Sequence, residues 1–358
     1  MKKLLTPFEK GTLKFKNHLV MAPMTRSRAI NNLPNELMAT YYAQRSGAGL
    51  IITEGTSPSP EGLGYPRIPG IYSDAQIQGW KKVTDAVHHN QSKIFLQLMH
   101  TGRIAHIANL PDGLQPVSPS GIKAAGEIYT DSLGMQEHSV PQELSLEGIN
   151  KIINDFVTAS KNAVSAGFDG IELHGANGYL LEQFLNPNVN IREDQYGGNY
   201  INRSRLTIEI ARAVAEAIGK DKVGIRFSPF SQLSDQKPYD EAEVHNTYAH
   251  LSIELNKIGI AYIHLLSSPD ITEKTYQTIR DAFSNILIFS SGLTPETAEK
   301  RLQDSTADLV AFGRSFLSNP DFVKRIENNR SLNDVDYNTL YTPGETGYTD
   351  YPADSYIN

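Results

Sequence analysis

Short apolar runs and amphipathic stretches alternate along the whole chain. Eight of the apolar runs are brief and rich in β-branched residues, as is typical of buried parallel strands: residues 19–24, 49–55, 93–100, 170–174, 223–228, 261–266, 286–292 and 308–314. Helix-like stretches separate them, at residues 36–46, 74–90, 146–166, 203–218, 241–258 and 272–283, and a further helix opens at residue 294. This alternation predicts an α/β fold, a (β/α)8 TIM barrel.

A doubly wound α/β sheet is the rival fold, because it also alternates strands and helices. That fold usually carries a glycine-rich turn after its first strand, and residues 22–26, Ala-Pro-Met-Thr-Arg, do not form one. We therefore expect residues 1–358 to form a single barrel domain. Residues 333–358 are a polar, tyrosine-rich tail that either packs on the barrel or frays.

Two long connections interrupt the rhythm of strands and helices. Residues 55–73 and 101–141 follow the second and third predicted strands, and the longer one contains a possible hairpin at 128–140. Loops that follow barrel strands lie over the face where barrel enzymes carry their active sites. We expect both connections to cap that face as lids or binding loops.

Composition and net charge exclude several classes of partner and chemistry. The chain has 358 residues, a net charge of −7, no long basic run and no cysteine. The charge argues against a nucleic acid partner. The lack of cysteine excludes disulfides, thiolate catalysis and cysteine-held iron–sulfur clusters. The N-terminal stretch is too short for a signal sequence and no segment has the length of a membrane helix, so we expect a cytoplasmic protein without a membrane partner, either a monomer or a homodimer.

Polar side chains cluster after the fourth predicted strand, where His174, Asn177 and Tyr179 follow one another closely. The first two can donate hydrogen bonds, and the phenol of Tyr179 can give up a proton. The pattern predicts a site that holds an oxygen atom and protonates a neighbouring atom. A histidine at a strand end is also often a structural residue, so the pattern alone leaves that interpretation open.

Alternation along the fifth and third predicted strands turns Arg226 and Gln97 toward the barrel interior. Burying an unpaired charge costs several kcal/mol, so the arginine needs an anion or several acceptors. One interpretation is a structural ion pair with Glu54 or Glu172. The other is an electron-rich ligand, and an inward glutamine suits a planar heterocycle that carries amide groups.

The last two predicted strands end in Ser291-Gly292 and Gly313-Arg314. Barrels often bind phosphate at this place through backbone N–H groups, and arginine adds a planar fork of donors. Together with the inward polar residues, these ends predict a phosphate-bearing heterocyclic cofactor across the barrel mouth.

These residues make the chain similar to the old yellow enzyme family, FMN-dependent ene-reductases built on a TIM barrel. The similarity covers nearly the whole chain and is carried by Arg226 and by residues 22–29, 97–103, 174–205, 313–320 and 347–352. The 174–205 run is the most specific of these motifs.

The resemblance implies a set of contacts around a non-covalently bound FMN: Pro23, Met24, Thr25, Gly55, Gln97, Arg226, Ser291, Gly292, Gly313, Arg314 and Tyr348. In this assignment Gly55 lets the flavin ring approach the second strand, and Arg226 stabilises the negative charge of the reduced flavin. Tyr348 is expected near the dimethylbenzene edge, and the residues from Ser291 to Arg314 at the phosphate.

The resemblance also implies a reaction, in which NADH or NADPH supplies a hydride and an activated alkene receives it. The substrate would be a small α,β-unsaturated carbonyl, maleimide or nitro compound. His174 and Asn177 would grip its oxygen, and Tyr179 would be the proton donor, while Tyr65 and Thr25 would form part of the substrate wall. Many bacterial members have histidine where this chain has Asn177, so substrate preference is expected to differ.

Two other functions compete with this one. A metal-dependent TIM-barrel hydrolase could use His100, His174 and His264, which lie at or near strand ends. It leaves the inward Arg226 without a role. A flavin-binding protein without turnover is the second alternative, and it leaves Tyr179 without a role.

Overall fold

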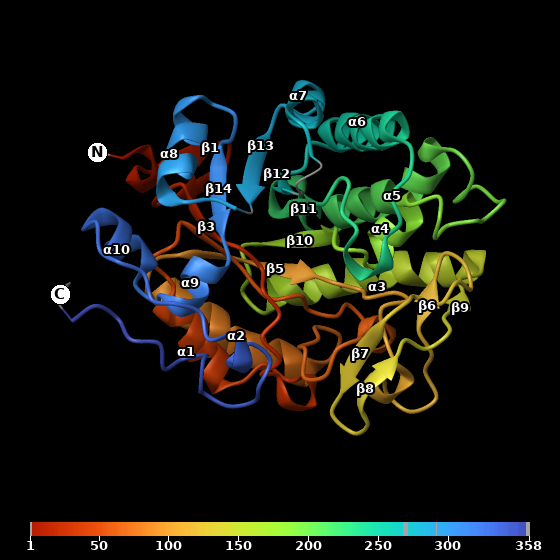
Figure 1. Cartoon of the computed structure of the whole chain (residues 1–358), viewed down its shortest axis with the longest axis horizontal. Coiled ribbons are helices and arrows are strands. Elements are labelled where there is room, and N and C mark those ends of the chain that lie inside the picture. The colour runs from red at the N-terminus through yellow and green to blue at the C-terminus, as the bar shows by residue number, and fades with distance from the viewer. Residues whose placement is uncertain (1, 268–270, 291, 356–358) are drawn as a thin grey trace.

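The computed structural model describes residues 2–267, 271–290 and 292–355, and its centre is a closed parallel barrel. The barrel strands follow one another around the cylinder in chain order, and the last pairs with the first (Figure 1). They are β3 Leu19–Met21, β4 Leu50–Ile52, β5 Lys93–Leu98, β10 Gly170–Gly175, β11 Val223–Phe227, β12 Tyr262–Leu266, β13 Ile286–Ser290 and β14 Leu309–Phe312. The barrel prediction is confirmed.

Helices surround the barrel, one or more after each strand (Figure 1). The longer ones are α1 Glu36–Gln44, α2 Asp74–His89, α3 Leu146–Ser165, α5 Tyr200–Ile218, α6 Glu241–Ile258, α7 Glu273–Ala282 and α8 Pro295–Gln303, and the shorter ones are α4 Leu180–Leu185, α9 Arg314–Ser318 and α10 Phe322–Glu327. Several begin at a side chain that accepts an N–H from the first turn, as Ser73 does in a capping box with Gln76. None of the described helices has the length and apolar character needed to cross a membrane.

Side chains of the barrel strands alternate between two apolar layers. One layer faces the helices and includes Leu173, Ile225 and Leu265. The other fills the barrel interior and includes Phe95 and Tyr262. Because both faces of each strand are buried, the strands read in the sequence as continuous apolar runs.

An N-terminal hairpin lies at the amino ends of the barrel strands. It consists of β1 Phe8–Lys10 and β2 Leu13–Phe15, which pair antiparallel. Phe8 and Phe15 stack with ring centroids 6.0 Å apart and pack on the interior layer. This hairpin was not predicted. It packs against the interior layer at the end of the barrel from which the strands start.

The connection after β5 forms its own small structures over the barrel mouth. β7 Glu127–Thr130 and β8 Gly134–Glu137 form an antiparallel hairpin, which agrees with the expected one at 128–140. β6 Val117–Ser118 pairs with β9 Gln142–Glu143 beside it. Figure 1 shows this hairpin projecting from the barrel.

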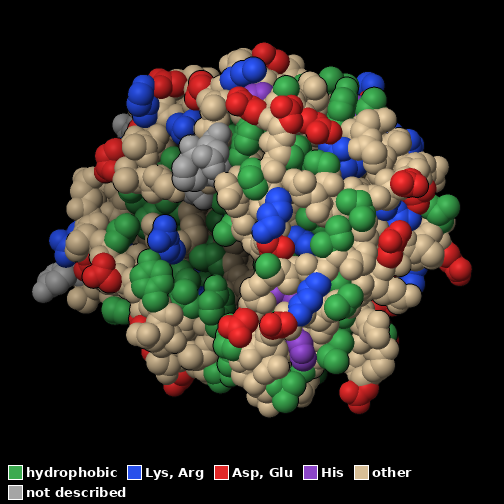
Figure 2. Space-filling view, turned by 45° about the vertical axis from the view of Figure 1, so that its right-hand side comes forward, with side chains coloured by type: hydrophobic (Ala, Val, Ile, Leu, Met, Phe, Trp, Pro, Cys, Tyr) green, Lys and Arg blue, Asp and Glu red, His purple; other side chains and the backbone are tan. Residues whose placement is uncertain are grey.

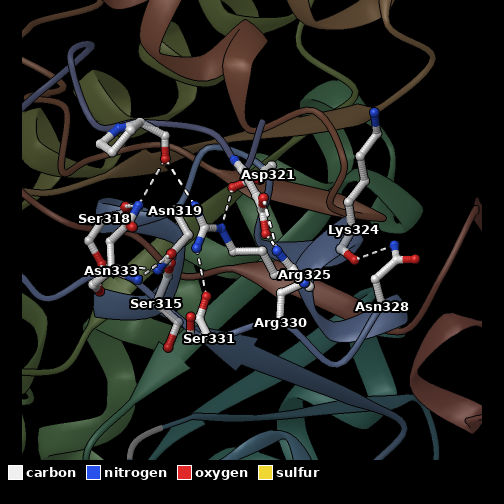
Figure 3. Close-up of polar contacts among 12 residues, drawn as sticks. Ser315, Ser318, Asn319, Asp321, Lys324, Arg325, Asn328, Arg330, Ser331 and Asn333 are labelled. Atoms are coloured by element: carbon white, nitrogen blue, oxygen red, sulfur yellow. Dashed lines mark hydrogen bonds and ion pairs between the residues drawn. The ribbon is translucent and has the colours of Figure 1, made fainter. Parts of the chain in front are cut away.

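The C-terminal tail packs on the barrel instead of fraying, and Figure 3 shows its anchor on α9 and α10. Asn333 accepts a hydrogen bond from Ser318 at its carbonyl oxygen (2.9 Å), and its N–H donates to Asn319 Oδ1 (2.7 Å). Arg325 donates to the carbonyl oxygens of Ser331 (2.6 Å) and Pro352 (3.1 Å). These contacts fix both ends of the segment that reaches the barrel mouth.

Candidate active site

Polar side chains from neighbouring strands form two layers in the barrel interior. The upper layer is the one nearer the carboxyl ends of the strands. In the upper layer the strand register aligns His174 on β10 with Arg226 on β11, and Arg226 with His264 on β12. In the layer below, Glu172 on β10 is aligned with Gln97 on β5. Arg226 and Gln97 therefore point inward, as their positions in the strands predicted.

Glu172 organises the lower layer. Its carboxylate accepts a hydrogen bond from Gln97 Nε2 at 2.8 Å and contacts His264 Nδ1 at 2.9 Å. The structural ion pair with Glu54 or Glu172, one of the two interpretations of Arg226, is not found: the ion pairs among the described residues do not include Arg226. Glu54 instead accepts hydrogen bonds from the Arg26 backbone N–H and the Tyr42 hydroxyl.

The guanidinium of Arg226 is held in the barrel without its full complement of acceptors. Its Nε is buried and has no hydrogen-bond partner among the described residues. Burial lowers the pKa of Arg226, and the negative charge of Glu172 opposes that effect. A buried donor of this strength is costly unless a ligand supplies an acceptor.

Other buried polar atoms also lack partners within the described part of the chain. They are His174 Nδ1 and His264 Nε2, on the strands next to Arg226, and Asn177 Oδ1, on the turn after β10. Unpaired donors and acceptors at the end of the barrel strands fit a planar heterocycle with carbonyl and N–H groups, such as the ring of FMN. The residues present at the barrel mouth therefore fit the cofactor that the sequence predicted.

A tight turn carries the chain from β10 into α4. Asn177 and Gly178 both have left-handed backbone angles, with φ of 58° and 78°. A Cβ at position 178 would lie 2.7 Å from the carbonyl oxygen of Leu233, so glycine is required there on both counts. The turn places the Tyr179 ring edge-on against the His174 ring, with centroids 4.9 Å apart. The three residues expected to act together are thus neighbours.

Protonation states in this group follow from burial and neighbouring charge. Burial lowers the pKa of His174 well below its ordinary value, and the positive charge of Arg226 adds to the effect. Burial also raises the pKa of Tyr179 well above its ordinary value, with a further contribution from Tyr65. At neutral pH the site therefore holds a neutral imidazole and a protonated phenol.

A cavity of about 930 Å³ lies above these residues. Thr25, Tyr65 and Tyr179 line it, as expected for the substrate wall, and the Tyr179 hydroxyl donates to the Tyr65 hydroxyl at 3.1 Å. Ile128 of the β7–β8 hairpin and Tyr341 of the tail line it as well. Figure 2 shows one face of the molecule hollowed in this way and bordered by hydrophobic side chains.

The sequence did not indicate Tyr341, because it lies in an irregular segment without periodicity. Its position is set by two arginines that bind carbonyl oxygens of the tail. Arg67 donates to the Tyr341 carbonyl at 2.9 Å, and Arg28 donates to those of Leu340 and Thr339 at 2.7 and 2.8 Å. The tail is therefore part of the cavity wall.

Of the expected phosphate residues, Gly292, Gly313 and Arg314 follow the carboxyl ends of neighbouring barrel strands. Ser290 on β13 is aligned with Ala311 on β14, so Gly292 and Gly313 follow neighbouring strand ends. Arg314 is exposed, starts α9 and donates to the Tyr337 hydroxyl at 3.2 Å. Ser291, the remaining member of this set, lies outside the described residues.

The segment expected to line the flavin, from Pro23 to Thr25, follows β3 beside these strand ends. A Cβ at Gly313 would lie 3.2 Å from the sulfur of Met24, which brings the two expected contacts together. A Cβ at Gly55 would collide with the sulfur of the Met99 side chain, so the glycine leaves room for Met99 in this structure. The expected approach of the flavin ring to Gly55 stays a prediction.

Tyr348 is a correction to the expected cofactor contacts. Its ring stacks on Tyr41 with centroids 4.0 Å apart, and the guanidinium groups of Arg26 and Arg28 lie over it at 5.2 and 4.9 Å. The side chain is completely buried among these protein groups. It has no free surface for a flavin edge, so its role is to seat the tail on α1.

The fold and the site together define a barrel oxidoreductase with a flavin site at its mouth. The sequence profile of the NADH:flavin oxidoreductase / NADH oxidase family matches residues 3–333. 12-Oxophytodienoate reductase 1 of Oryza sativa subsp. japonica is 40% identical over 359 residues, which cover 98% of this chain and 92% of that protein. 12-Oxophytodienoate reductase 2 of Arabidopsis thaliana is 37% identical, with 98% and 95% covered.

Solved structures give the same result. Morphinone reductase superimposes with a TM-score of 0.93 at 42% identity, covering 98% of this chain and 96% of that one. A structure of morphinone reductase in complex with tetrahydroNAD gives a TM-score of 0.95 at 42% identity, with 99% of both chains covered. The chain belongs to the NADH:flavin oxidoreductase family, and it is an FMN-dependent enzyme that reduces activated carbon–carbon double bonds with electrons from NAD(P)H.

Membership of this family argues against the metal-dependent hydrolase, which was an alternative interpretation of the sequence. His264 is bound to Glu172, and the described residues include no group of three or more side chains that could hold a metal ion. His100 is buried, and its Nδ1 accepts the Gly102 N–H at 3.1 Å.

Proposed function

We propose that His174 and Asn177 hold the carbonyl or nitro oxygen of an activated alkene, and that Tyr179 protonates its α-carbon. The observation that carries this proposal is the contact of the His174 and Tyr179 rings beneath the cavity. Both residues lie beside Asn177, and both His174 and Asn177 have a buried polar atom without a partner among the described residues.

The donors act on the electron distribution of the substrate. As the alkene accepts a hydride at its β-carbon, negative charge develops on the oxygen that is conjugated to the double bond. Hydrogen bonds from a neutral His174 and from the Asn177 amide stabilise that charge. The neutral imidazole of His174 still has one ring N–H, which can donate a hydrogen bond to the substrate oxygen. His174 does not need to gain or lose a proton during turnover.

Tyr179 then completes the reduction. FMN, when bound, would supply the hydride taken from NAD(P)H, and the phenol of Tyr179 supplies the proton. The high pKa of Tyr179, caused by burial, keeps the phenol protonated until the carbanionic carbon needs a proton. Tyr65, which accepts a hydrogen bond from that phenol, orients it and gives a route for its reprotonation through the cavity.

For the cofactor we propose that Arg226 and Gln97 bind the pyrimidine edge of the FMN ring. Gly292, Gly313 and Arg314 would bind its phosphate. The support is the position of Arg226 on β11 and of Arg314 after β14, both at the carboxyl end of the barrel strands. Arg226 would place a positive charge beside the part of the ring that becomes negative on reduction.

Separate measurement of the two half-reactions tests the proposal. The purified FMN-loaded protein is reduced anaerobically with NADH or NADPH, and then mixed with 2-cyclohexen-1-one. Both steps should occur, and the product should be cyclohexanone. Reduction by NAD(P)H without reoxidation by the enone or by N-ethylmaleimide would instead identify a flavin-binding protein without this turnover.

A further inference from the structure

A buried carboxyl group lies directly behind the substrate-binding turn. Glu182, in the first turn of α4, is 5% exposed. Its Oε2 accepts the backbone N–H of Gly178 at 2.6 Å. Its Oε1 accepts hydrogen bonds from Ser228 Oγ at 2.7 Å and from the Tyr248 hydroxyl at 3.3 Å. The carboxyl group therefore joins the turn to the end of β11 and to α6.

Ser228 extends this network to Asn177. Its hydroxyl donates to Glu182 and accepts the backbone N–H of Asn177 at 2.8 Å. The N–H groups of Asn177 and Gly178, the two left-handed residues of the turn, are thus both tied to Glu182, one directly and one through Ser228. An asparagine in this backbone region is strained unless its surroundings fix it.

Burying the carboxylate of Glu182 costs free energy unless a cation or hydrogen-bond donors compensate its negative charge. The ion pairs found among the described residues do not include it. The titratable groups that face it are Tyr248 from α6 and, from the segment before that helix, Tyr239 and Lys237, whose ammonium group pairs with Asp235. A carboxylate buried without a cation is satisfied here only by donors, and two of those lead to the turn.

We propose that Glu182 is a positioning residue for the substrate. Its carboxylate fixes the Asn177–Gly178 turn and thereby the direction of the Asn177 amide, although Glu182 itself touches neither substrate nor cofactor. This inference rests on the proposed role of Asn177 in holding the substrate oxygen. A residue of this kind should affect binding of the alkene more than the chemical step.

A second cavity makes the proposal testable by chemical rescue. It has a volume of about 270 Å³ and is lined by Glu182, Tyr248 and Gln236. The Gln236 side chain is buried, and neither its Oε1 nor its Nε2 has a partner among the described residues. Truncation of Glu182 to alanine would enlarge this cavity, so formate or acetate could enter and replace the lost carboxylate.

The experiment compares FMN-loaded Glu182→Ala and Ser228→Ala with wild type in the reduction of 2-cyclohexen-1-one. Each variant should raise KM for the enone by about tenfold, with a change in kcat of less than about threefold. Sodium formate should restore KM in Glu182→Ala. It should not restore KM in Ser228→Ala, which keeps the carboxylate and lacks the hydroxyl that accepts the Asn177 N–H.

The pH dependence gives a further readout. Burial raises the pKa of Glu182 to about 7, so the carboxylate gains its charge as the pH rises through that value. KM of the wild type should fall as the pH rises through about 7. Glu182→Gln, which cannot ionise, should show no such decrease.

Each outcome has a defined meaning. An unchanged KM in Glu182→Ala would overturn the proposal. So would a loss of FMN binding and of kcat together without rescue by formate, because that result indicates a purely structural role. If the wild type itself does not reduce the enone, the proposed function fails. Glu182 can then still be judged from the Kd of a phenol measured by the absorbance of bound FMN.

Discussion

Replacement of Tyr179 by phenylalanine separates the proposed proton donor from the rest of the site. The change removes one hydroxyl group and keeps the ring that packs against His174. General acid catalysis contributes about 10²–10⁴-fold to a rate, which corresponds to about 3–5 kcal/mol of barrier. We expect reoxidation by 2-cyclohexen-1-one to slow by that factor, and reduction by NAD(P)H to change less than about threefold.

The structure shows why this loss should be chemical and not structural. Among the described residues the Tyr179 hydroxyl makes one hydrogen bond, to the hydroxyl of Tyr65 at 3.1 Å, and its loss should cost the fold about 1 kcal/mol. Tyr65→Phe is the matched control, because it removes the same hydrogen bond and leaves the phenol of Tyr179 in place. That control should keep the enone half-reaction within about tenfold of wild type.

Anaerobic stopped-flow absorbance of the bound FMN measures the two half-reactions separately. The predicted result is a selective loss in Tyr179→Phe and a small effect in Tyr65→Phe. If both half-reactions of Tyr179→Phe slowed equally, or if the control were as slow as the variant, Tyr179 would not be the acid.

Three further predictions concern charge, protonation and the corrected tyrosine. Arg226→Met removes the buried charge, so the Kd for FMN, from fluorescence titration, should rise at least about tenfold; an unchanged Kd would place the flavin elsewhere. Burial lowers the pKa of His174, and the unfolded chain binds a proton below about pH 6.5, so His174 should lower the free energy of unfolding by up to about 2 kcal/mol at pH 5. Urea unfolding should therefore show a smaller stability loss between pH 7 and 5 for His174→Asn than for wild type, and equal losses would contradict this. The Tyr348 hydroxyl is buried without a partner among the described residues, so Tyr348→Phe should keep the unfolding free energy within about 1 kcal/mol or raise it, with no change in flavin absorbance.

The fold could be predicted because a barrel repeats one local pattern. Each strand is buried on both faces and each helix on one, so hydrophobic periodicity alone indicated every barrel strand. The same alternation correctly turned Arg226 and Gln97 inward, since residues two apart on a strand share a face. Neither inference required knowledge of which segments meet in space.

The rest of the site depends on contacts between distant segments, and these leave no local signal. Glu182 and Ser228 are 46 residues apart, and Arg28 lies 311 residues from the Thr339 carbonyl that it binds. A sequence cannot show that the Met99 side chain lies against Gly55. Nor can it show that Tyr348 is enclosed by arginines, because both facts belong to the packed core.

The source of the two hydrogens added to the double bond tests the account most directly. Reduction of 2-cyclohexen-1-one with unlabelled NAD(P)H in D2O should place deuterium at the α-carbon and protium at the β-carbon, because Tyr179 exchanges its proton with solvent and the hydride comes from the nicotinamide. The position of the label is read by NMR of the cyclohexanone, collected before exchange at its α-positions and compared with cyclohexanone kept in the same buffer. Deuterium at the β-carbon, or protium from the nicotinamide at the α-carbon, would contradict the roles assigned to the residues of the barrel mouth.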